Sequence, residues 1–211
     1  MKNKKGNFLM TVGIILMVGA AALTAYNLLT EYLAGRQSEE VLYNMDIKPA
    51  GEDDIPFYEI YPDMPMPVKV IDGKEYIGKL YIEKLDRELP ILSEFSYDGL
   101  RTAPCRYKGS IYRNDMIIAG HNYKTHFGNF RSLTIGDKVT FTDMDGNVFE
   151  YTIDAVENVD GRNIEGMEAG DWDLSLFTCN YRGDARVTMR CKRIIQQKTV
   201  DAEMPQPIFC I

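Results

Sequence analysis

Short runs of alternating apolar and polar residues dominate the chain from Ile77 onward, and turn-forming residues separate them. Alternation with a period of two is typical of strands that bury one face. The pattern predicts seven or eight strands and only one or two short helices, near 95–100 and 127–134. The clearest strand runs are residues 77–83, 88–92, 115–121, 138–143, 148–159, 173–179 and 186–194. Asp145-Gly146 predicts a hairpin turn between two of them. Closing the sheet protects many short strand edges, so the pattern favours a mainly β, closed or nearly closed barrel.

A different pattern occupies the N-terminus, where residues 8–29 form an uncharged and mostly apolar run. A helix of about 20 residues crosses the hydrocarbon core of a membrane, and the apolar part of a cleaved signal peptide is shorter. The run therefore predicts an uncleaved transmembrane anchor. Lys2, Lys4 and Lys5 precede it and Glu31 follows it, which places residues 1–7 in the cytoplasm and the body outside the cell membrane. The expected topology is single-pass type II.

Residues 30–67 are polar, acidic and rich in proline toward their end. Each proline removes an amide donor and restricts the residue before it, so an extended strap is expected here rather than a helix. The composition favours an extracellular linker, and a lid folded over the active site is the second interpretation. The catalytic domain is then expected at residues 68–196, followed by a C-terminal tail at 197–211.

Charge and cysteine content exclude several classes of function. The chain has 24 basic and 31 acidic residues, and the first 30 residues hold three of the bases and none of the acids. The body is therefore strongly acidic, which argues against nucleic-acid binding. No Cys-x-x-Cys pair occurs among Cys105, Cys179, Cys191 and Cys210, so no structural zinc site is expected. For Cys105 we favour a buried structural role, and a disulfide with Cys191 is the second option outside the cell. Cys210 does not fit a prenylation pattern.

Three residues at predicted strand ends could perform chemistry together. Cys179 ends the run 173–179 before a polar turn, where a substrate could reach a thiol, although many free cysteines are buried. His121 ends the run 115–121 after Gly120, and we favour it over His126, which lies in a predicted loop or helix start. A rigid strand end positions a catalytic group better than a loop does.

The third residue, Arg186, begins the strand that follows Cys179. A short turn joins the two runs, so antiparallel pairing would return the guanidinium to the thiol. Alternation places Arg190 on the same face, about 13 Å further along, as a reserve candidate. A solvated basic face is the plainer interpretation of this strand.

Cysteine, histidine and arginine together suit acyl transfer. A thiolate attacks an amide carbonyl, an imidazolium protonates the leaving amine, and a guanidinium stabilises the oxyanion. Thr178 could add a contact beside the nucleophile. This chemistry requires neither a metal nor an organic cofactor.

These residues resemble the motifs of sortases, the cysteine transpeptidases of Gram-positive cell surfaces. The resemblance rests on Leu176-Phe177-Thr178-Cys179, on Arg186-Val187 and on Ile118-Ala119-Gly120-His121-Asn122. It covers about Ile77 to Ile194, and it departs from the family pattern at Ser175, where threonine is usual. The resemblance implies an eight-stranded β-barrel and assigns the catalytic roles to His121, Cys179 and Arg186.

The resemblance also implies a substrate and partners. The thiolate would cleave a sorting signal similar to Leu-Pro-x-Thr-Gly on a surface protein and form a thioester. An amine from a peptidoglycan precursor or a pilin would then resolve it. The signal would lie in a groove walled by the strand before Cys179 and by residues 160–172. Asp54-Ile55-Pro56-Phe57 does not match the Asp-Pro-aromatic lid of pilus-building members, which favours anchoring over polymerisation.

Two other classes of cysteine enzyme fit the sequence less well. L,D-transpeptidases place glycine, cysteine and arginine almost contiguously, and papain-like peptidases place cysteine before histidine, so neither matches this order. A non-catalytic surface-binding domain is the remaining alternative.

Overall fold

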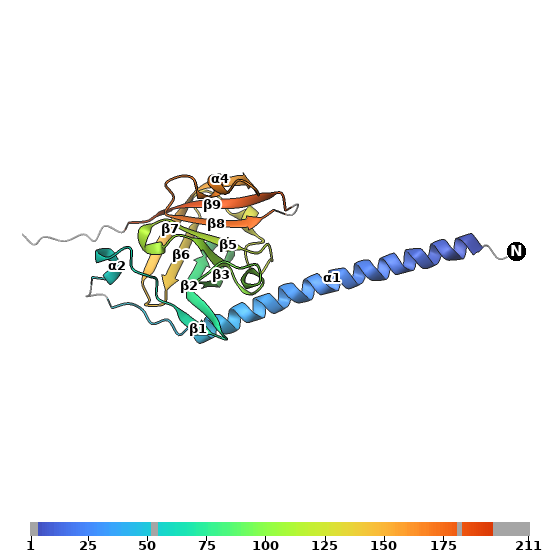
Figure 1. The fold of residues 1–211 in the computed structure, drawn as a ribbon, viewed down its shortest axis with the longest axis horizontal. Helices are drawn as coiled ribbons and strands as arrows, with labels where there is room; N and C mark the ends of the chain where they lie inside the picture. The colour runs from blue at the N-terminus through green and yellow to red at the C-terminus, as the bar shows by residue number, and fades with distance from the viewer. Residues whose placement is uncertain (1–3, 52–54, 181–182, 196–211) are drawn as a thin grey trace, which may run out of the picture.

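The computed structural model describes residues 4–51, 55–180 and 183–195, and this part of the chain contains nine strands (Figure 1). Eight of them close into a barrel in the order β2-β3-β4-β5-β8-β9-β7-β6, because β6 pairs back with β2. The prediction of a closed eight-stranded barrel is therefore confirmed. The barrel strands are β2 (Lys74–Ile82), β3 (Arg87–Leu92), β4 (Cys105–Lys108), β5 (Met116–Gly120), β6 (Lys138–Asp143), β7 (Val148–Asp160), β8 (Leu174–Cys179) and β9 (Ala185–Arg193).

Burial of one face explains why the alternating runs form these strands. Along β6, Val139 and Phe141 are buried in the barrel core while Thr140 and Thr142 are only half-buried. The same alternation continues in β7 through Phe149 and beyond. The Asp145-Gly146 turn joins these two strands as predicted, and Gly146 has a positive φ of 84°. Turn chemistry and core burial thus agree on the register of this hairpin.

Two short strands were not predicted. β1 (Lys69–Ile71) forms a hairpin with β2, and β4 joins β3 to β5. The predicted helical stretches contain a short α3 (Gly99–Thr102) and a 3-10 turn, η3 (Phe130–Ser132). Further short helices are α2 (Phe57–Ile60), α4 (Ile164–Glu168), η1 (Glu83–Leu85) and η2 (Ile111–Arg113).

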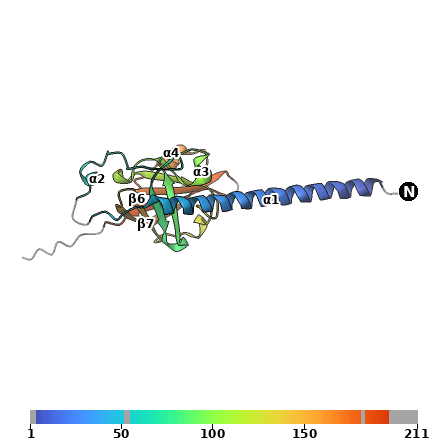
Figure 2. The same cartoon turned by 90° about the horizontal axis from the view of Figure 1, so that it is seen from below.

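The N-terminal helix α1 (Lys4–Met45) is much longer than the predicted anchor. Its apolar first part projects away from the barrel, and its side chains are exposed (Figures 1 and 2). By length and composition it could cross a membrane. Its last turns pack on the barrel, where they contact β1, β3 and α3.

The extended linker expected at residues 30–67 is thus helical as far as Met45, which corrects that expectation. The buried residues Ala34, Ser38, Val41 and Met45 recur at helical spacing and form a stripe against the domain. The proline argument holds only for the later part, since the first proline of the linker is Pro49. Asp46, with a φ of 44°, ends the helix, and the strap that follows has only the short α2 before β1.

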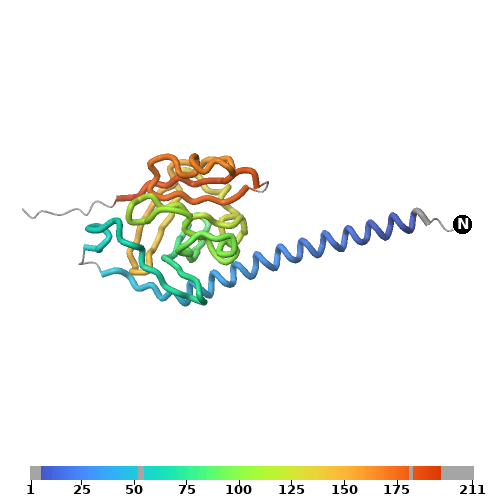
Figure 3. The backbone as a smooth tube through the Cα atoms, in the orientation of Figure 1, coloured from blue at the N-terminus to red at the C-terminus, as the bar shows by residue number. Residues whose placement is uncertain are grey.

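The described strap, residues 46–51 and 55–68, crosses the end of the barrel that holds the β6–β7 turn (Figure 3). The Ala50 N–H donates to the carbonyl of Gly146 at that turn (3.3 Å). Tyr58 of α2 stacks on Tyr112, with ring centroids 4.8 Å apart. β7 runs from this end to Asp160, which pairs with Ala185 at the opposite end of the barrel. The described strap therefore does not cover the end at which β8 terminates.

Candidate active site at the ends of three strands

Three neighbouring strands bring the predicted chemical residues to one end of the barrel. β5 pairs with β8 in parallel, and Gly120 is the partner of Thr178. His121 follows Gly120, so it lies beside Cys179. β8 pairs with β9 in antiparallel fashion, and Cys179 is the direct partner of Arg186. The prediction that the two runs pair across a short turn is confirmed.

The three side chains also share one face of the sheet. Leu174 and Leu176 of β8 point into the barrel core, so Ser175, Phe177 and Cys179 point outward. Directly paired residues face the same way, which turns Arg186 outward with Cys179. In β5, Ile118 belongs to the core and Ala119 to the outer cluster, so alternation turns His121 outward as well.

Cys179 is the exposed cysteine among those described, and its thiol is free. Cys105 and Cys191 are also free, but both are buried and they belong to different apolar clusters. No disulfide joins them, which overturns that option. Burial raises the pKa of Cys105 to about 11 and raises that of Cys191 as well, so both stay protonated. Cys210 lies outside the described residues.

His121 is half-buried and is held by its own loop. The ring of Tyr123 stacks on the imidazole, with centroids 3.9 Å apart and an interplanar angle of 9°. The Phe127 N–H donates to the His121 carbonyl (3.2 Å). Burial, and then the positive charge of Arg101, lower the pKa of His121 below its ordinary value. The imidazole is therefore mainly neutral at pH 7 and able to accept a proton.

His126, the other histidine, is completely buried beneath α1. Its Nε2 lies 3.4 Å from Ser38 Oγ, and Ser38 in turn donates to the carbonyl of Thr102 (3.3 Å). Burial, with the nearby His121 and Arg87, lowers the pKa of His126 to about 4. The ring is neutral and enclosed, which leaves it no access to a substrate.

Arg186 is half-buried and is the second residue of β9, at its turn end. Its Nη2 donates to the carbonyl of Gly161 (3.0 Å), and its guanidinium carbon lies 5.2 Å from the centre of the Phe177 ring. These contacts are a hydrogen bond and a cation–π interaction that aim the group along the outer face. Among the residues that the structure describes, further hydrogen-bond donors of the guanidinium remain for a substrate oxygen.

Arg190, the reserve candidate, is structural. It is 1% exposed, and its ion-pair partner is Glu157 at 3.0 Å. It also donates to Ser175 Oγ (3.0 Å) and to the carbonyls of Gly166 and Met167 (both 2.7 Å). The middle of the basic face of β9 is therefore not solvated, because α4 and its flanking loop cover Arg190, whereas Arg186 and Lys192 stay partly exposed.

A small apolar cluster lies on the outer face of the sheet near the thiol. It contains Ile117 and Ala119 of β5, Phe177 of β8 and Met167 of α4, all of them buried. Beside the thiol is a narrow cleft lined by Asn122, Phe127, Gly128, Phe130, Arg131, Thr178, Cys179, Asn180 and Val187. Thr178 Oγ1 and His121 Nδ1 are both buried without a hydrogen-bond partner in the described part of the chain. These polar atoms lie in or beside the proposed reaction centre.

Sequence patterns did not single out Arg101 or Tyr123. Tyr123 follows His121 by two residues, and an aromatic so near a candidate base was the available signal. Arg101 acts on His121 from α3, a contact across the fold that no local spacing predicts. The described residues contain no group of three or more His, Cys, Asp or Glu side chains that could hold a metal ion.

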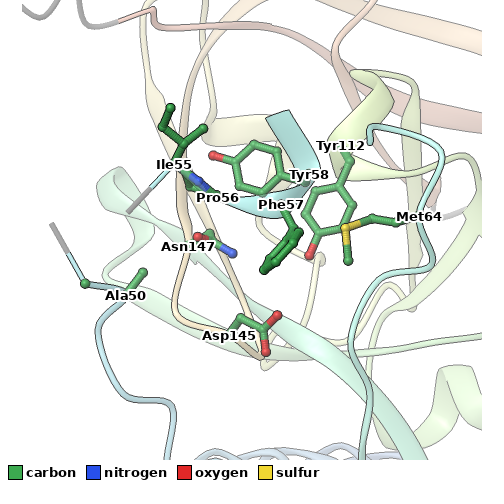
Figure 4. Close-up of a pocket in the computed structure, with 10 residues that line it drawn as sticks. Ala50, Ile55, Pro56, Phe57, Tyr58, Met64, Tyr112, Asp145 and Asn147 are labelled. Carbon is green, nitrogen blue, oxygen red and sulfur yellow. The ribbon is translucent and has the colours of Figure 1, made fainter. Parts of the chain in front are cut away.

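A larger pocket of about 510 Å³ lies at the opposite end of the barrel (Figure 4). The strap residues Phe57 and Met64 line it together with Tyr112, Asp145 and Asn147. Nearby, Asp143 is buried and accepts hydrogen bonds from Tyr112 Oη (2.8 Å) and from the backbone and side chain of Asn147. This network ties the strap end of the barrel together, away from the thiol.

Comparison with known proteins points to one family. A model of the sortase domain matches residues 80–194. The fold is similar to sortase C1 from Streptococcus agalactiae, with 23% identity over 60% of this chain and 72% of that chain (TM-score 0.52). It is also similar to a Streptococcus pneumoniae sortase C, with 22% identity over 80% of this chain and 90% of that chain (TM-score 0.52). A pilus-related sortase C of group B Streptococcus has 21% identity over 64% and 77% of the chains (TM-score 0.51). No curated protein matches this chain in sequence.

Proposed function

Because this chain belongs to the sortase family, we propose that it is a membrane-anchored cysteine transpeptidase with Cys179 as nucleophile, His121 as acid/base and Arg186 as oxyanion-stabilising cation. One observation carries these assignments. Cys179 is exposed and free, and it pairs directly with Arg186. It also lies beside His121, which follows the strand partner of Thr178, Gly120. The three groups that acyl transfer needs therefore occupy the same face at the same strand ends.

The reaction begins with the Cys179 thiol beside a mainly neutral His121 imidazole. His121 accepts the proton of Cys179, and the thiolate attacks the carbonyl carbon of the scissile amide. A carbon–sulfur bond forms, and the carbonyl electron pair moves to oxygen. Arg186 donates to that oxyanion, where a preorganised cation is most effective. The oxyanion then collapses, the carbon–nitrogen bond breaks, and His121 returns its proton to the leaving amine.

The second half of the reaction reverses these roles. An incoming amine attacks the thioester carbonyl, and His121 takes a proton from the attacking nitrogen. The carbon–sulfur bond breaks, and the proton passes back to the Cys179 sulfur. A new amide is formed and the enzyme is regenerated. With water in place of the amine, the same steps give hydrolysis, so endopeptidase activity is expected as a side reaction.

The outer surface of β5 and β8 suits an extended peptide similar to Leu-Pro-x-Thr-Gly. Ile117, Ala119 and Phe177 are buried there, and the partly buried Phe95, Leu100 and Tyr107 that pack on them are the apolar side chains that a leucine and a proline could contact. Residues 160–172, which include α4, form one wall, and their Gly161 carbonyl also orients Arg186. A sorting signal bound here would place its scissile carbonyl near Cys179.

The setting proposed is the outer face of a cell membrane. Lysines precede the apolar part of α1 and the acidic body follows it, so the barrel would lie outside. The acceptor would be an amine of a peptidoglycan precursor or of a pilin. The strap lacks the Asp-Pro-aromatic lid sequence, and its described residues lie at the other end of the barrel, so we favour anchoring over polymerisation.

A thioester-trapping experiment tests this function. The full chain in detergent micelles would be incubated with a panel of peptides related to Leu-Pro-x-Thr-Gly, quenched in acid and measured by intact-mass spectrometry. We expect a mass increase equal to the peptide fragment that ends at the threonine, located on Cys179 and released by hydroxylamine. Cys179→Ala should give no adduct and no cleavage. An adduct on another cysteine, or cleavage by Cys179→Ala, would overturn the assignment.

A further inference from the structure

The helix that leaves the apolar segment also touches the loop that follows His121. Glu31 is only two residues beyond the apolar run that ends at Leu29. Its carboxylate accepts a hydrogen bond from the Lys124 N–H (2.6 Å), and its carbonyl accepts one from Thr125 Oγ1 (3.4 Å). The same residue therefore binds two successive positions of the loop 122–128.

Two further residues of α1 continue this contact at helical spacing. Gly35 lies against Thr125 so closely that an added Cβ would stand 2.8 Å from Thr125 Cγ2. Ser38 Oγ lies 3.4 Å from Nε2 of the buried His126. Positions 31, 35 and 38 lie on one face of a helix, and each meets a different part of the loop.

The loop in turn holds His121 at two points. Tyr123 lies between the two histidines, stacked on His121 at 3.9 Å and tilted against His126 at 5.5 Å. Phe127 bonds to the His121 carbonyl and packs beneath Gly120, where an added Cβ would stand 2.2 Å from its ring. A displacement of the loop would therefore move both the ring and the backbone of His121.

The loop is also fixed from behind by β3. Arg87 donates to the carbonyls of Lys124 and His126, and its own charge is offset by Glu31. Helix, loop and β3 thus form one connected set of polar contacts. His121 Nδ1 has no hydrogen-bond partner among the described residues, so these contacts, rather than a carboxylate, orient the ring.

We infer that Glu31, Gly35 and Ser38 of α1 are positioning residues for His121, so that the helix carrying the apolar segment also sets the geometry of the active site. This inference rests on the proposed role of His121 as acid/base. A misplacement of about 1 Å in a catalytic group lowers the rate by up to about 100-fold. The helix would therefore contribute to kcat without touching the substrate.

The decisive variant is Gly35→Leu in the full chain in lipid nanodiscs, with Gly19→Leu as its matched control. Both changes add the same side chain to the same helix, but nothing lies within 4 Å of the Gly19 position. We expect kcat of Gly35→Leu to fall about 10- to 100-fold with KM for a signal peptide within about twofold. Thr125→Ala in the Gly35→Leu background removes the clashing methyl and should restore most of kcat.

A second pair tests the polar contact. Glu31→Ala removes the acceptor of the Lys124 N–H, whereas Glu31→Gln keeps an oxygen there and should retain activity. Glu39→Ala is the control, because Glu39 lies on the exposed face of the same helix and pairs with Arg36 on the surface. Only Glu31→Ala should behave like Gly35→Leu.

An activity-independent readout separates this inference from the proposed function. The chain has two histidines, so ¹³C-labelled imidazole gives two resolvable signals. Gly35→Leu should move the His121 signal and raise its pKa toward the ordinary value as the ring loosens. The titratable and charged groups around that ring are Arg101, Tyr123, His126, Arg87, Glu31, Cys179 and Arg186.

An unmoved His121 signal in Gly35→Leu, or a moved signal with unchanged kcat, would overturn the positioning role. An inactive wild-type chain would instead contradict the proposed function. The His121 signal would still show whether α1 positions the imidazole ring.

Discussion

At two rungs of β8 and β9, that is, at two pairs of directly opposed residues, an arginine lies opposite a small residue with a nucleophilic side chain. The two arginines nevertheless have different roles. At the open end of β8 and β9, Cys179 faces Arg186, and four residues inward Ser175 faces Arg190. Both rungs lie on the outer face of the sheet. The inner rung is sealed beneath α4, and Arg190 is held there by Glu157, Ser175 and two carbonyls. The outer rung is partly open, and within the described part of the chain Arg186 makes one hydrogen bond, to the carbonyl of Gly161.

The difference between the rungs lies in access and unsatisfied hydrogen-bonding capacity. A guanidinium has five N–H donors, and Arg190 uses most of them to hold the fold together. Arg186 uses fewer among the described residues, so it keeps donors that can bind a developing charge. The two histidines repeat the contrast, since His121 lies at the open end and His126 is enclosed. Residue type therefore does not distinguish the proposed catalytic residues from the structural ones. Their position relative to the open strand ends does.

The largest expected effect separates the small residues of the two rungs. Cys179→Ala removes the proposed nucleophile and should lower kcat/KM for a signal peptide by at least about 10⁴-fold, with unchanged thermal stability. Ser175→Ala removes only one acceptor from Arg190 and should change kcat/KM less than about threefold while lowering stability by about 1 kcal/mol. Steady-state cleavage kinetics and thermal unfolding of the full chain measure both. Equal activity in the two variants would abolish the distinction between the rungs.

Substitution of the two arginines should have different effects: the loss of Arg186 should lower activity, and the loss of Arg190 should lower stability. Arg186→Gln should reduce kcat about 10²- to 10³-fold, as the loss of an oxyanion donor does, with little change in unfolding. Arg190→Gln should instead destabilise the fold by about 3 kcal/mol, because it removes a buried guanidinium and leaves the carbonyls of Gly166 and Met167 without that donor. Chemical denaturation and kcat per folded molecule are the measurements. A catalytic defect in folded Arg190→Gln equal to that of Arg186→Gln would argue against a structural role for the inner rung.

The enclosed histidine should appear in the pH dependence of stability. His126 has a pKa lowered to about 4 in the folded state, against about 6.5 when unfolded. The unfolded state therefore binds more protons between these values, and the stability present above pH 6.5 is lost as pH falls toward 4, by about 3 kcal/mol. His126→Gln should flatten this slope. His121→Gln, the matched control at the open end, should keep most of it, and an equal slope in wild type and His126→Gln would contradict the burial argument.

Local sequence predicted the barrel well where one face of a strand is buried over several residues. Residues 138–143 match β6 from end to end, and the outward alternation of Arg186 and Arg190 on β9 was read correctly. The sequence pattern does not predict β4, because its four residues, Cys105–Lys108, include a register shift and lack an apolar alternation. The seal over Arg190 could not be predicted either, since it depends on α4 folding back across β9.

The extension of α1 was missed for a related reason. The face of α1 that packs on the barrel combines Ala34 and Ser38 with Val41 and Met45. This face is too weakly apolar to be recognised as a buried helix face from the sequence. The partners of that face, such as His126 and Thr102, lie far away in sequence. The candidate residues at the strand ends were accessible to local reasoning, whereas the residues that support them are joined only by the fold.

The smallest effect concerns the thiols themselves. In a Cys210→Ser background, three cysteines remain, and iodoacetamide should alkylate Cys179 at least about tenfold faster than Cys105 or Cys191, because both of those are buried with raised pKa values. Peptide mapping after timed quenching gives the three rates. Ser175→Cys in a Cys179→Ala chain places a thiol on the inner rung and should label as slowly as Cys191. Fast labelling at that position would show that α4 does not seal the inner rung, and the contrast between the two arginines would then need another cause.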